Sequence, residues 1–126
     1  MKDRSSMESG RTILTLACAR TSRKIRKIRS LSQEEAAMRS NISQSYLSNI
    51  EQGRNLISLI TLLSLTSGLD VDFNEGLDLL GNEVSDLSDL LNSYNSNTEK
   101  YKLYDDFSDL VRSNIDKDRL TPDAFL

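Results

Sequence analysis

The 126-residue sequence contains no histidine, no tryptophan and a single cysteine, Cys18. One such chain cannot assemble a disulfide, a Cys/His metal site, or a Ser-His or Cys-His catalytic pair. We therefore expect no metal and no cofactor, and an enzyme is the least favoured class of function.

Helix breakers and aromatic residues are also scarce: proline occurs once, glycine five times, and aromatics make up 6% of the chain. Leucine and isoleucine dominate the apolar residues, which favours an all-α fold. The apolar run at residues 13–19 is too short to span a bilayer, and acidic Asp3 and Glu8 precede it. Neither a membrane segment nor a secretory signal is predicted, so the expected location is the cytoplasm.

The net charge of -3 is unevenly distributed. Residues 1–67 hold eleven Lys/Arg and five Asp/Glu, a balance of +6, whereas residues 68–126 hold five and fourteen, a balance of -9. The cations of residues 20–29 have no acids at i+4 to balance them. The basic part is suited to phosphates, and the acidic part is expected to stay away from them.

The first two helices are indicated by spacing and by a cap. Residues 14–28 carry apolar or small side chains at steps of four, three, four and three, which is one helical face. Ser32 and Glu35 form a capping box, so a second helix is predicted to begin at Gln33.

A tight turn is predicted at residues 40–43. Asn41 tolerates a left-handed backbone, and Ser43 is a good N-cap for a third helix. That helix is expected to end near Gln52, because Gly53 is a typical helix stop.

The rest of the chain predicts three more segments. Ser58 caps a fourth helix that ends near Gly68, with an inward face formed by Leu59, Leu62, Leu63, Leu65 and Leu69. A short fifth segment is expected around 73–80, followed by a stretch over 81–97 that is rich in Asn, Ser and Asp. Its apolar residues Leu87, Leu90 and Leu91 could form a loosely packed helix. Ser96 and Glu99 form a second capping box, which predicts an amphipathic helix over 98–116.

The segment from Gln33 to Gly53 has the features of a helix-turn-helix. A small residue, Ala37, stands where two short helices must touch, Asn41 stands at the turn, and Leu47 and Ile50 face the core. This pattern favours DNA binding over a helical hairpin without a DNA role.

The same stretch resembles the Cro/cI-type, or Xre-type, helix-turn-helix regulators of lambdoid phages. The similarity runs without a gap from about Arg20 to Leu77 and includes LSQEEAA at 31–37, ISQSYLSNIEQG at 42–53, SLITLLSL at 58–65 and GLDV at 68–71. It implies a five-helix lambda-repressor-like DNA-binding domain over residues 1–80, with an acidic helical extension over 81–126. Four positions depart from the family pattern: Ser22, Ser40, Asn41 and Ile57.

The resemblance implies that the start of the third helix enters the major groove. Base contacts are then expected from Ser43, Gln44, Ser45, Ser48 and Asn49. Gln44 and Asn49 are the strongest candidates, because an amide can pair with adenine through two hydrogen bonds. DNA backbone contacts are expected from Gln33, Tyr46, Arg54 and Asn55, with Arg39 and Lys27 as weaker candidates. Tyr46 could equally cover the core.

Four residues are expected to have structural roles. The family pairs the positions of Arg26 and Glu51, and Ala37 and Asn41 serve the helix contact and the turn.

These features predict a transcriptional regulator, most simply a repressor, that binds a pseudo-palindromic double-stranded operator as a homodimer. The dimer is expected to form through a stripe on the 98–116 helix: Leu103, Phe107, Leu110, Val111 and Ile115. One alternative is an antitoxin whose C-terminal half binds a toxin as a protein partner. Another is a protein-interaction adaptor with a vestigial helix-turn-helix.

Overall fold

The computed structural model describes residues 4–125, with side chains from residue 9 onward. Within that range every regular element is a helix, which confirms the predicted all-α class. The helices are α1 (Arg4–Ile28), α2 (Gln33–Arg39), α3 (Gln44–Glu51), α4 (Leu59–Gly68), α5 (Phe73–Ser96) and α6 (Phe107–Ser113), followed by the 3-10 turn η1 (Pro122–Phe125). None of the helices in this range combines the length and apolarity needed to cross a membrane.

The predicted helix starts are confirmed by their caps. The hydroxyls of Ser32, Ser43 and Ser58 each accept a hydrogen bond from the backbone N–H three residues further on, at 3.0 to 3.1 Å. Asn41 has a φ of 57° and Gly53 a φ of 74°, so both residues take the left-handed conformation that ends a helix. The boundaries of α2 and α3 are therefore set by local sequence.

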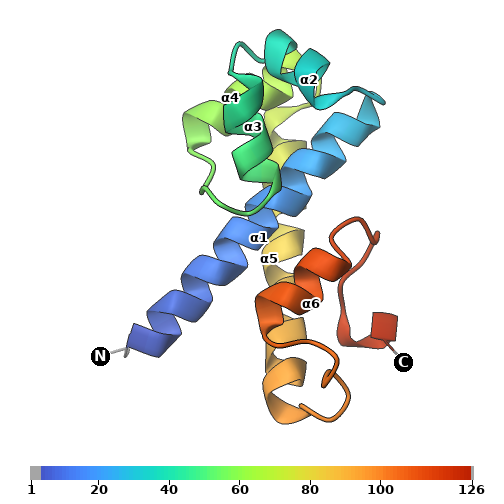
Figure 1. The fold of residues 1–126 in the computed structure, drawn as a ribbon. Helices are drawn as coiled ribbons and strands as arrows, with labels where there is room; N and C mark the ends of the chain where they lie inside the picture. Colours follow the sequence, from blue (N-terminus) through green and yellow to red (C-terminus); the bar gives the residue numbers. More distant parts are fainter. Residues whose placement is uncertain (1–3, 126) are drawn as a thin grey trace.

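The helix-turn-helix belongs to the first of two hydrophobic cores. As Figure 1 shows, α2, α3 and α4 gather around the C-terminal half of α1 and the start of α5. The buried residues of this core are Ile25, Ala36, Ala37, Leu47, Leu62, Leu65, Leu69 and Val71. They bring together side chains from every element between α1 and the start of α5.

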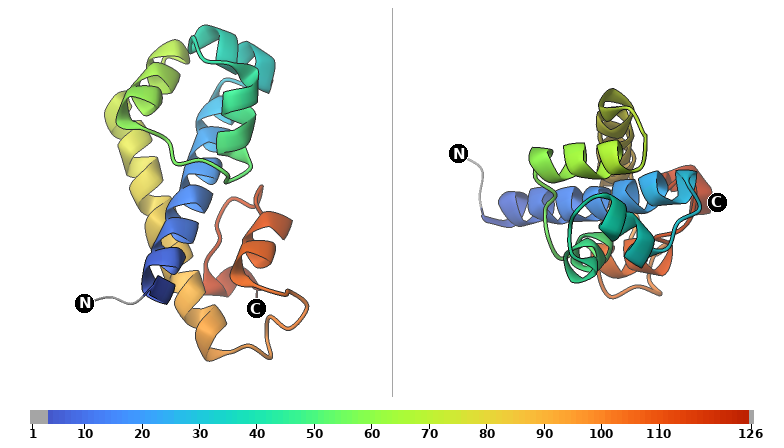
Figure 2. Two further views of the ribbon diagram at one scale, coloured as in Figure 1. Left: turned by 60° about the vertical axis from the view of Figure 1, so that its left-hand side comes forward. Right: turned by 90° about the horizontal axis from the view of Figure 1, so that it is seen from above.

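A second core forms at the other end of α1 and α5. Here α6 and the C-terminal segment lie along the second half of α5 (Figures 1 and 2). The buried residues are Leu16, Ala17, Leu87, Leu90, Tyr101, Phe107, Leu110, Val111 and Leu120. Because α1 and α5 run through both cores, the extension is packed onto the helix-turn-helix unit by two shared helices.

The prediction that the fifth segment ends near residue 80 is wrong, because α5 is one helix of 24 residues that continues through Gly81. The helix expected around Leu87, Leu90 and Leu91 is present, but it is part of α5, and Leu87 and Leu90 are buried. Its apolar stripe continues at Leu80, Val84, Leu87 and Leu91, which all pack in the second core. The expected boundary between residues 80 and 81 thus falls inside a helix.

The predicted helix over 98–116 is also wrong. The Ser96 hydroxyl donates to the carbonyl of Asn92 at 2.8 Å instead of capping a new helix. Residues 97–106 form turns, and only Phe107–Ser113 is helical. The chain turns because Tyr101 is buried, with its ring 5.6 Å from that of Tyr94.

The expected dimer stripe is consequently not a free surface. Phe107, Leu110 and Val111 are buried in the chain's own second core, and Ile115 is half-buried. Leu103 is 89% exposed, but it lies alone in the turn region. A partner chain could not cover these five side chains together without unpacking α6.

Four residues of the predicted apolar helix faces are exposed. They are Leu14 and Ile28 on α1, and Leu59 and Leu63 on α4. The buried face of α4 is narrower than its sequence suggested and consists of Leu62, Leu65 and Thr66. Exposed leucines therefore remain on α4.

Candidate nucleic-acid interface

The core side of α3 is fixed by two residues. Leu47 and Ile50 are fully buried, and Ala37 on α2 is buried in the same unit, where a larger side chain would push α3 outward. At the start of the helix, Gln44 and Ser45 are exposed, with Ser45 on the side opposite Leu47 and Ile50. The start of α3 is thus presented to solvent on a rigid support.

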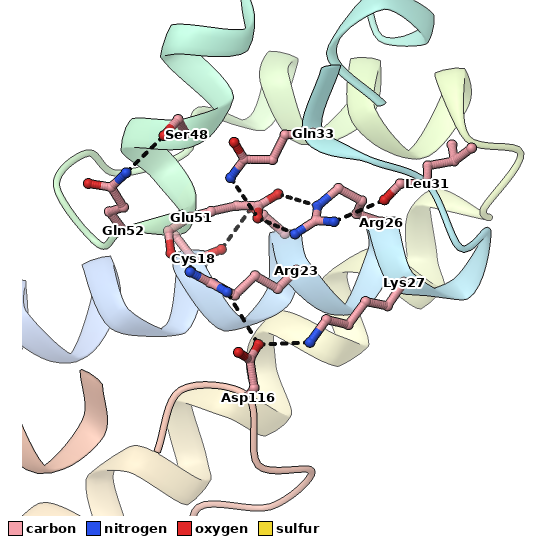
Figure 3. Close-up of polar contacts among 11 residues, drawn as sticks. Cys18, Arg23, Arg26, Lys27, Leu31, Gln33, Ser48, Glu51, Gln52 and Asp116 are labelled. Atoms are coloured by element: carbon pink, nitrogen blue, oxygen red, sulfur yellow. Dashed lines mark hydrogen bonds and ion pairs between the residues drawn. The ribbon is translucent and has the colours of Figure 1, made fainter. Parts of the chain in front are cut away.

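The side chains of the outward stripe differ in how they are engaged. Gln44 makes no side-chain hydrogen bond within the described part of the chain, whereas the Ser43 hydroxyl is the N-cap acceptor. Ser48 accepts a hydrogen bond from Gln52 at 2.8 Å (Figure 3). Asn49 accepts a hydrogen bond from Arg54 at 3.4 Å, and this contact leaves the Asn49 amide NH₂ available. Gln44 is the residue of this stripe best placed to offer both halves of its amide.

Beneath this stripe, Glu51 is fully buried and paired with Arg26. The two bonds run from Arg26 Nε to Oε2 at 2.8 Å and from Nη2 to Oε1 at 2.7 Å (Figure 3). Arg26 also donates to the Leu31 carbonyl at 2.9 Å. The hydrogen bond with Glu51 raises the pKa of Arg26 above its ordinary value. The pair ties α1 to α3 and neutralises an acid that would otherwise repel phosphate.

Two residues expected at the DNA backbone have partners within the chain. The Gln33 side chain donates to Glu51 at 3.2 Å, so its backbone N–H at the start of α2 is the group left for a phosphate (Figure 3). The Tyr46 hydroxyl lies 3.2 Å from the Thr61 hydroxyl and is hydrogen bonded to it. Tyr46 thereby links α3 to α4.

The basic face of α1 is partly covered by the acidic half of the chain. Arg20 donates to Glu83 on α5 at 2.5 Å and to the carbonyls of Ile115 and Asp118 at 2.6 and 3.0 Å. Both charged side chains are buried, with 0% and 2% exposure, and Lys24 is a second cationic partner of Glu83. The cations of α1 thus find acids far along the sequence.

Asp116 makes a similar contact nearer the surface. It accepts hydrogen bonds from Lys27 at 2.7 Å and from Arg23 at 3.2 Å (Figure 3). The Lys27 hydrogen bond, followed by the charge of Arg23, lowers the pKa of Asp116. Lys27, a weaker candidate for DNA backbone contact, is therefore engaged with the extension. The opposite charges of the two halves were the sequence signal for this contact.

Sequence analysis missed one cation near the end of α3. Arg112, in the last turn of α6, approaches Gly53, and a Cβ built on that glycine would lie 3.6 Å from Arg112 Nη2. Arg54 and Asn55 follow Gly53 directly, with Arg54 exposed and Asn55 half-buried. Nothing in the local sequence around Arg112 indicated this location, because α6 reaches it only through the second core.

Comparison with known proteins agrees with this arrangement. The helix-turn-helix family model matches residues 23–75. The chain is also similar to an uncharacterised HTH-type transcriptional regulator, y4dJ, of Sinorhizobium fredii. The two are 42% identical over 52 residues, which cover 41% of this chain and 68% of the relative. No solved structure matches the chain.

Proposed function

The chain belongs to the helix-turn-helix family of Cro/cI-type DNA-binding transcriptional regulators, and we propose that it is a repressor that binds a pseudo-palindromic operator as a homodimer. The observation that carries the proposal is the rigidly supported start of α3, where Gln44 and Ser45 are exposed while Leu47 and Ile50 are buried. A helix presented in this way fits the major groove.

Different residues in and around α3 are assigned to contacts with bases and to contacts with the DNA backbone. We assign base reading to Ser43, Gln44, Ser45, Ser48 and Asn49, with Gln44 as the principal reader because its amide has no partner in the described part of the chain. We assign contacts with the DNA backbone to Gln33, Tyr46, Arg54 and Asn55, where charge and N–H groups position the protein without selecting sequence.

Substitution of Gln44 tests the base-reading role. On a duplex selected from a random pool, Gln44→Ala is expected to weaken binding by about 1 to 3 kcal/mol and to relax the preference at one base pair per half-site. Affinity for unselected duplex should change little. Titrations of both duplexes at one salt concentration measure these changes.

Asn82→Ala is the control, because it removes an exposed side-chain amide on α5, outside the helix-turn-helix. It should leave the base preference intact. An equal loss on selected and unselected duplex with Gln44→Ala would instead assign Gln44 to the DNA backbone.

The homodimer requires a surface other than the buried stripe of α6. Leu59, Ile60 and Leu63 are exposed on α4, and Leu56 is exposed just before it. We propose that the same patch of a second copy covers them in an isologous contact about a two-fold axis. The Tyr46–Thr61 bond joins α4 to α3, so such a contact would fix the two recognition helices relative to each other. Half-sites one turn of DNA apart require that spacing to be about 34 Å, roughly 10 base pairs.

Ile60→Gln tests this dimer surface. Ile60 is 79% exposed, so the folded chain should keep its stability while its dimer weakens and sedimentation moves toward the monomer. Operator affinity should fall because the dimer is weakened, whereas the position of Gln44 in each chain should not change.

Leu103→Gln is the control, because Leu103 is still more exposed but lies in the extension. It should leave the dimer unchanged. Dissociation by Leu103→Gln rather than by Ile60→Gln would locate the dimer contact in the extension.

The antitoxin alternative depends on an acidic C-terminal half that is open to a toxin. Glu83, Asp86 and Asp116 each have a cationic partner within the chain, so part of that acidity is already used. Co-purification of a second small protein would favour this alternative over an autonomous repressor.

A further inference from the structure

A hollow of about 470 Å³ lies where the end of α3 meets the C-terminal extension. Its lining residues are Arg23, Gln52, Arg54, Arg112 and Ile115. Three of the five carry guanidinium groups, and they come from α1, from the loop after α3 and from α6. The hollow exists only because the extension folds back beside the helix-turn-helix.

The positive charge of this hollow is only partly neutralised. Arg23 donates to the Glu51 carbonyl at 3.0 Å and pairs with Asp116 at 3.2 Å. Within the described part of the chain, neither Arg54 nor Arg112 has a carboxylate within 4.0 Å. Positive charges held close together repel one another, so a bound anion that is attracted to all of them stabilises the arrangement.

The residue types favour phosphate among possible anions. A guanidinium presents a planar fork of N–H donors that matches two phosphate oxygens, and Gln52 adds an amide donor. Gly53 lies beside this arrangement, because a Cβ at this position would be in van der Waals contact with Arg112 Nη2, at 3.6 Å. Its φ of 74° also suits glycine, so the turn brings Arg54 and Arg112 to the same hollow.

We propose that this hollow binds a phosphate group, with Arg54 and Arg112 as its direct ligands and Arg23 supplying further positive charge. The phosphate can come from the backbone of bound duplex or from a free phosphorylated compound. The duplex source rests on the proposed DNA binding. It extends that proposal, because Arg112 of the otherwise acidic extension would contact the DNA backbone. The second source does not depend on DNA binding.

Salt dependence distinguishes the duplex source. The full chain and its Arg112→Ala variant are titrated with a 20-base-pair duplex over a range of NaCl concentrations. The slope of log K against log[NaCl] is expected to fall in magnitude by about 0.9 in the variant, the value for one lost phosphate contact. Arg119→Ala is the control, because it removes the same charge from the same extension. The Arg119 side chain lies outside the hollow and donates to Asp86 at 3.1 Å, so the slope of this variant should match that of the wild type.

Inorganic phosphate distinguishes the free source. The N–H signals of the arginine side chains are followed by NMR while phosphate is added to the wild type, Arg112→Ala and Arg119→Ala. If the hollow binds a free phosphate compound, the Arg54 and Arg112 signals of the wild type should shift and saturate. The Arg54 shift should be lost in Arg112→Ala, whereas both shifts should be kept in Arg119→Ala. Circular dichroism melting of each variant confirms that it is folded.

The outcomes separate this inference from the proposed function. A reduced slope supports the duplex source, and saturable phosphate binding with an unchanged slope supports the free source. An unchanged slope with no saturable shift overturns the inference while DNA binding stands. If the wild type binds no duplex, the proposed function fails, and the phosphate titration alone decides whether the hollow is a phosphate site.

Discussion

Replacing Arg26 by methionine is expected to lower the free energy of unfolding by about 3 to 5 kcal/mol. The cause is the partner left behind: Glu51 is fully buried, and its two carboxylate oxygens accept bonds from Arg26 at 2.7 and 2.8 Å. In the variant only the neutral amide of Gln33 would remain as a side-chain donor to it. Urea unfolding followed by circular dichroism measures the loss.

The double variant Arg26→Met/Glu51→Leu is the matched control, because it removes both charges and should regain much of the lost stability. An unchanged melting temperature in Arg26→Met, combined with abolished DNA binding, would make Arg26 a phosphate contact rather than part of the scaffold.

Glu83→Ala is expected to cost a similar amount, about 3 to 5 kcal/mol, because it strands the fully buried guanidinium of Arg20. Arg20 would keep only the carbonyls of Ile115 and Asp118. Since Arg20 and Glu83 join the two shared helices between the cores, both cores should lose stability together in one unfolding transition. Thermal unfolding monitored by circular dichroism and by tyrosine fluorescence tests whether the two signals coincide.

Asp86→Ala provides the comparison on the same helix. Its partner Arg119 is 70% exposed, so this surface pair should contribute far less stability than the buried pair of Glu83 and Arg20. If Glu83→Ala lowered the free energy of unfolding as little as Asp86→Ala, the buried Arg20–Glu83 pair would not contribute to stability as proposed. Separate transitions for the two signals would show that the extension is an independent unit.

Local signals were sufficient where the backbone is set by one or two residues. Ser32, Ser43 and Ser58 cap their helices through hydroxyl contacts three residues away, and Asn41 turns the chain by its own tolerance of positive φ. For that reason the helix-turn-helix and the helical class were predictable from sequence.

The extension was mispredicted because long-range packing overrides its local signals. Gly81 and the nearby asparagines are weak helix formers, yet the apolar stripe of α5 continues past them and is held by α1 and α6. The steps from Leu80 to Val84, Leu87 and Leu91 were visible in the sequence and could have revealed the long helix. The Ser96/Glu99 pair matched a capping box by chance, and burial of Tyr101 overrode it.

Gly68 shows a different limit of sequence reading. It was interpreted as a helix stop, and α4 does end there. A Cβ at this position would lie 2.5 Å from the Arg39 carbonyl oxygen, so the close approach of α2 and α4 also requires glycine. Such a requirement is invisible until the two backbones are placed side by side.

Selection of bound duplexes from a random pool by the full chain is the most direct test of sequence-specific DNA binding. The expected result is a two-fold-symmetric motif with half-sites about 10 base pairs apart. Its affinity should exceed that for unselected duplex by at least about 10³-fold at the same salt concentration. A pool that stays random after repeated rounds, with equal affinity for all duplexes, would contradict the proposed function.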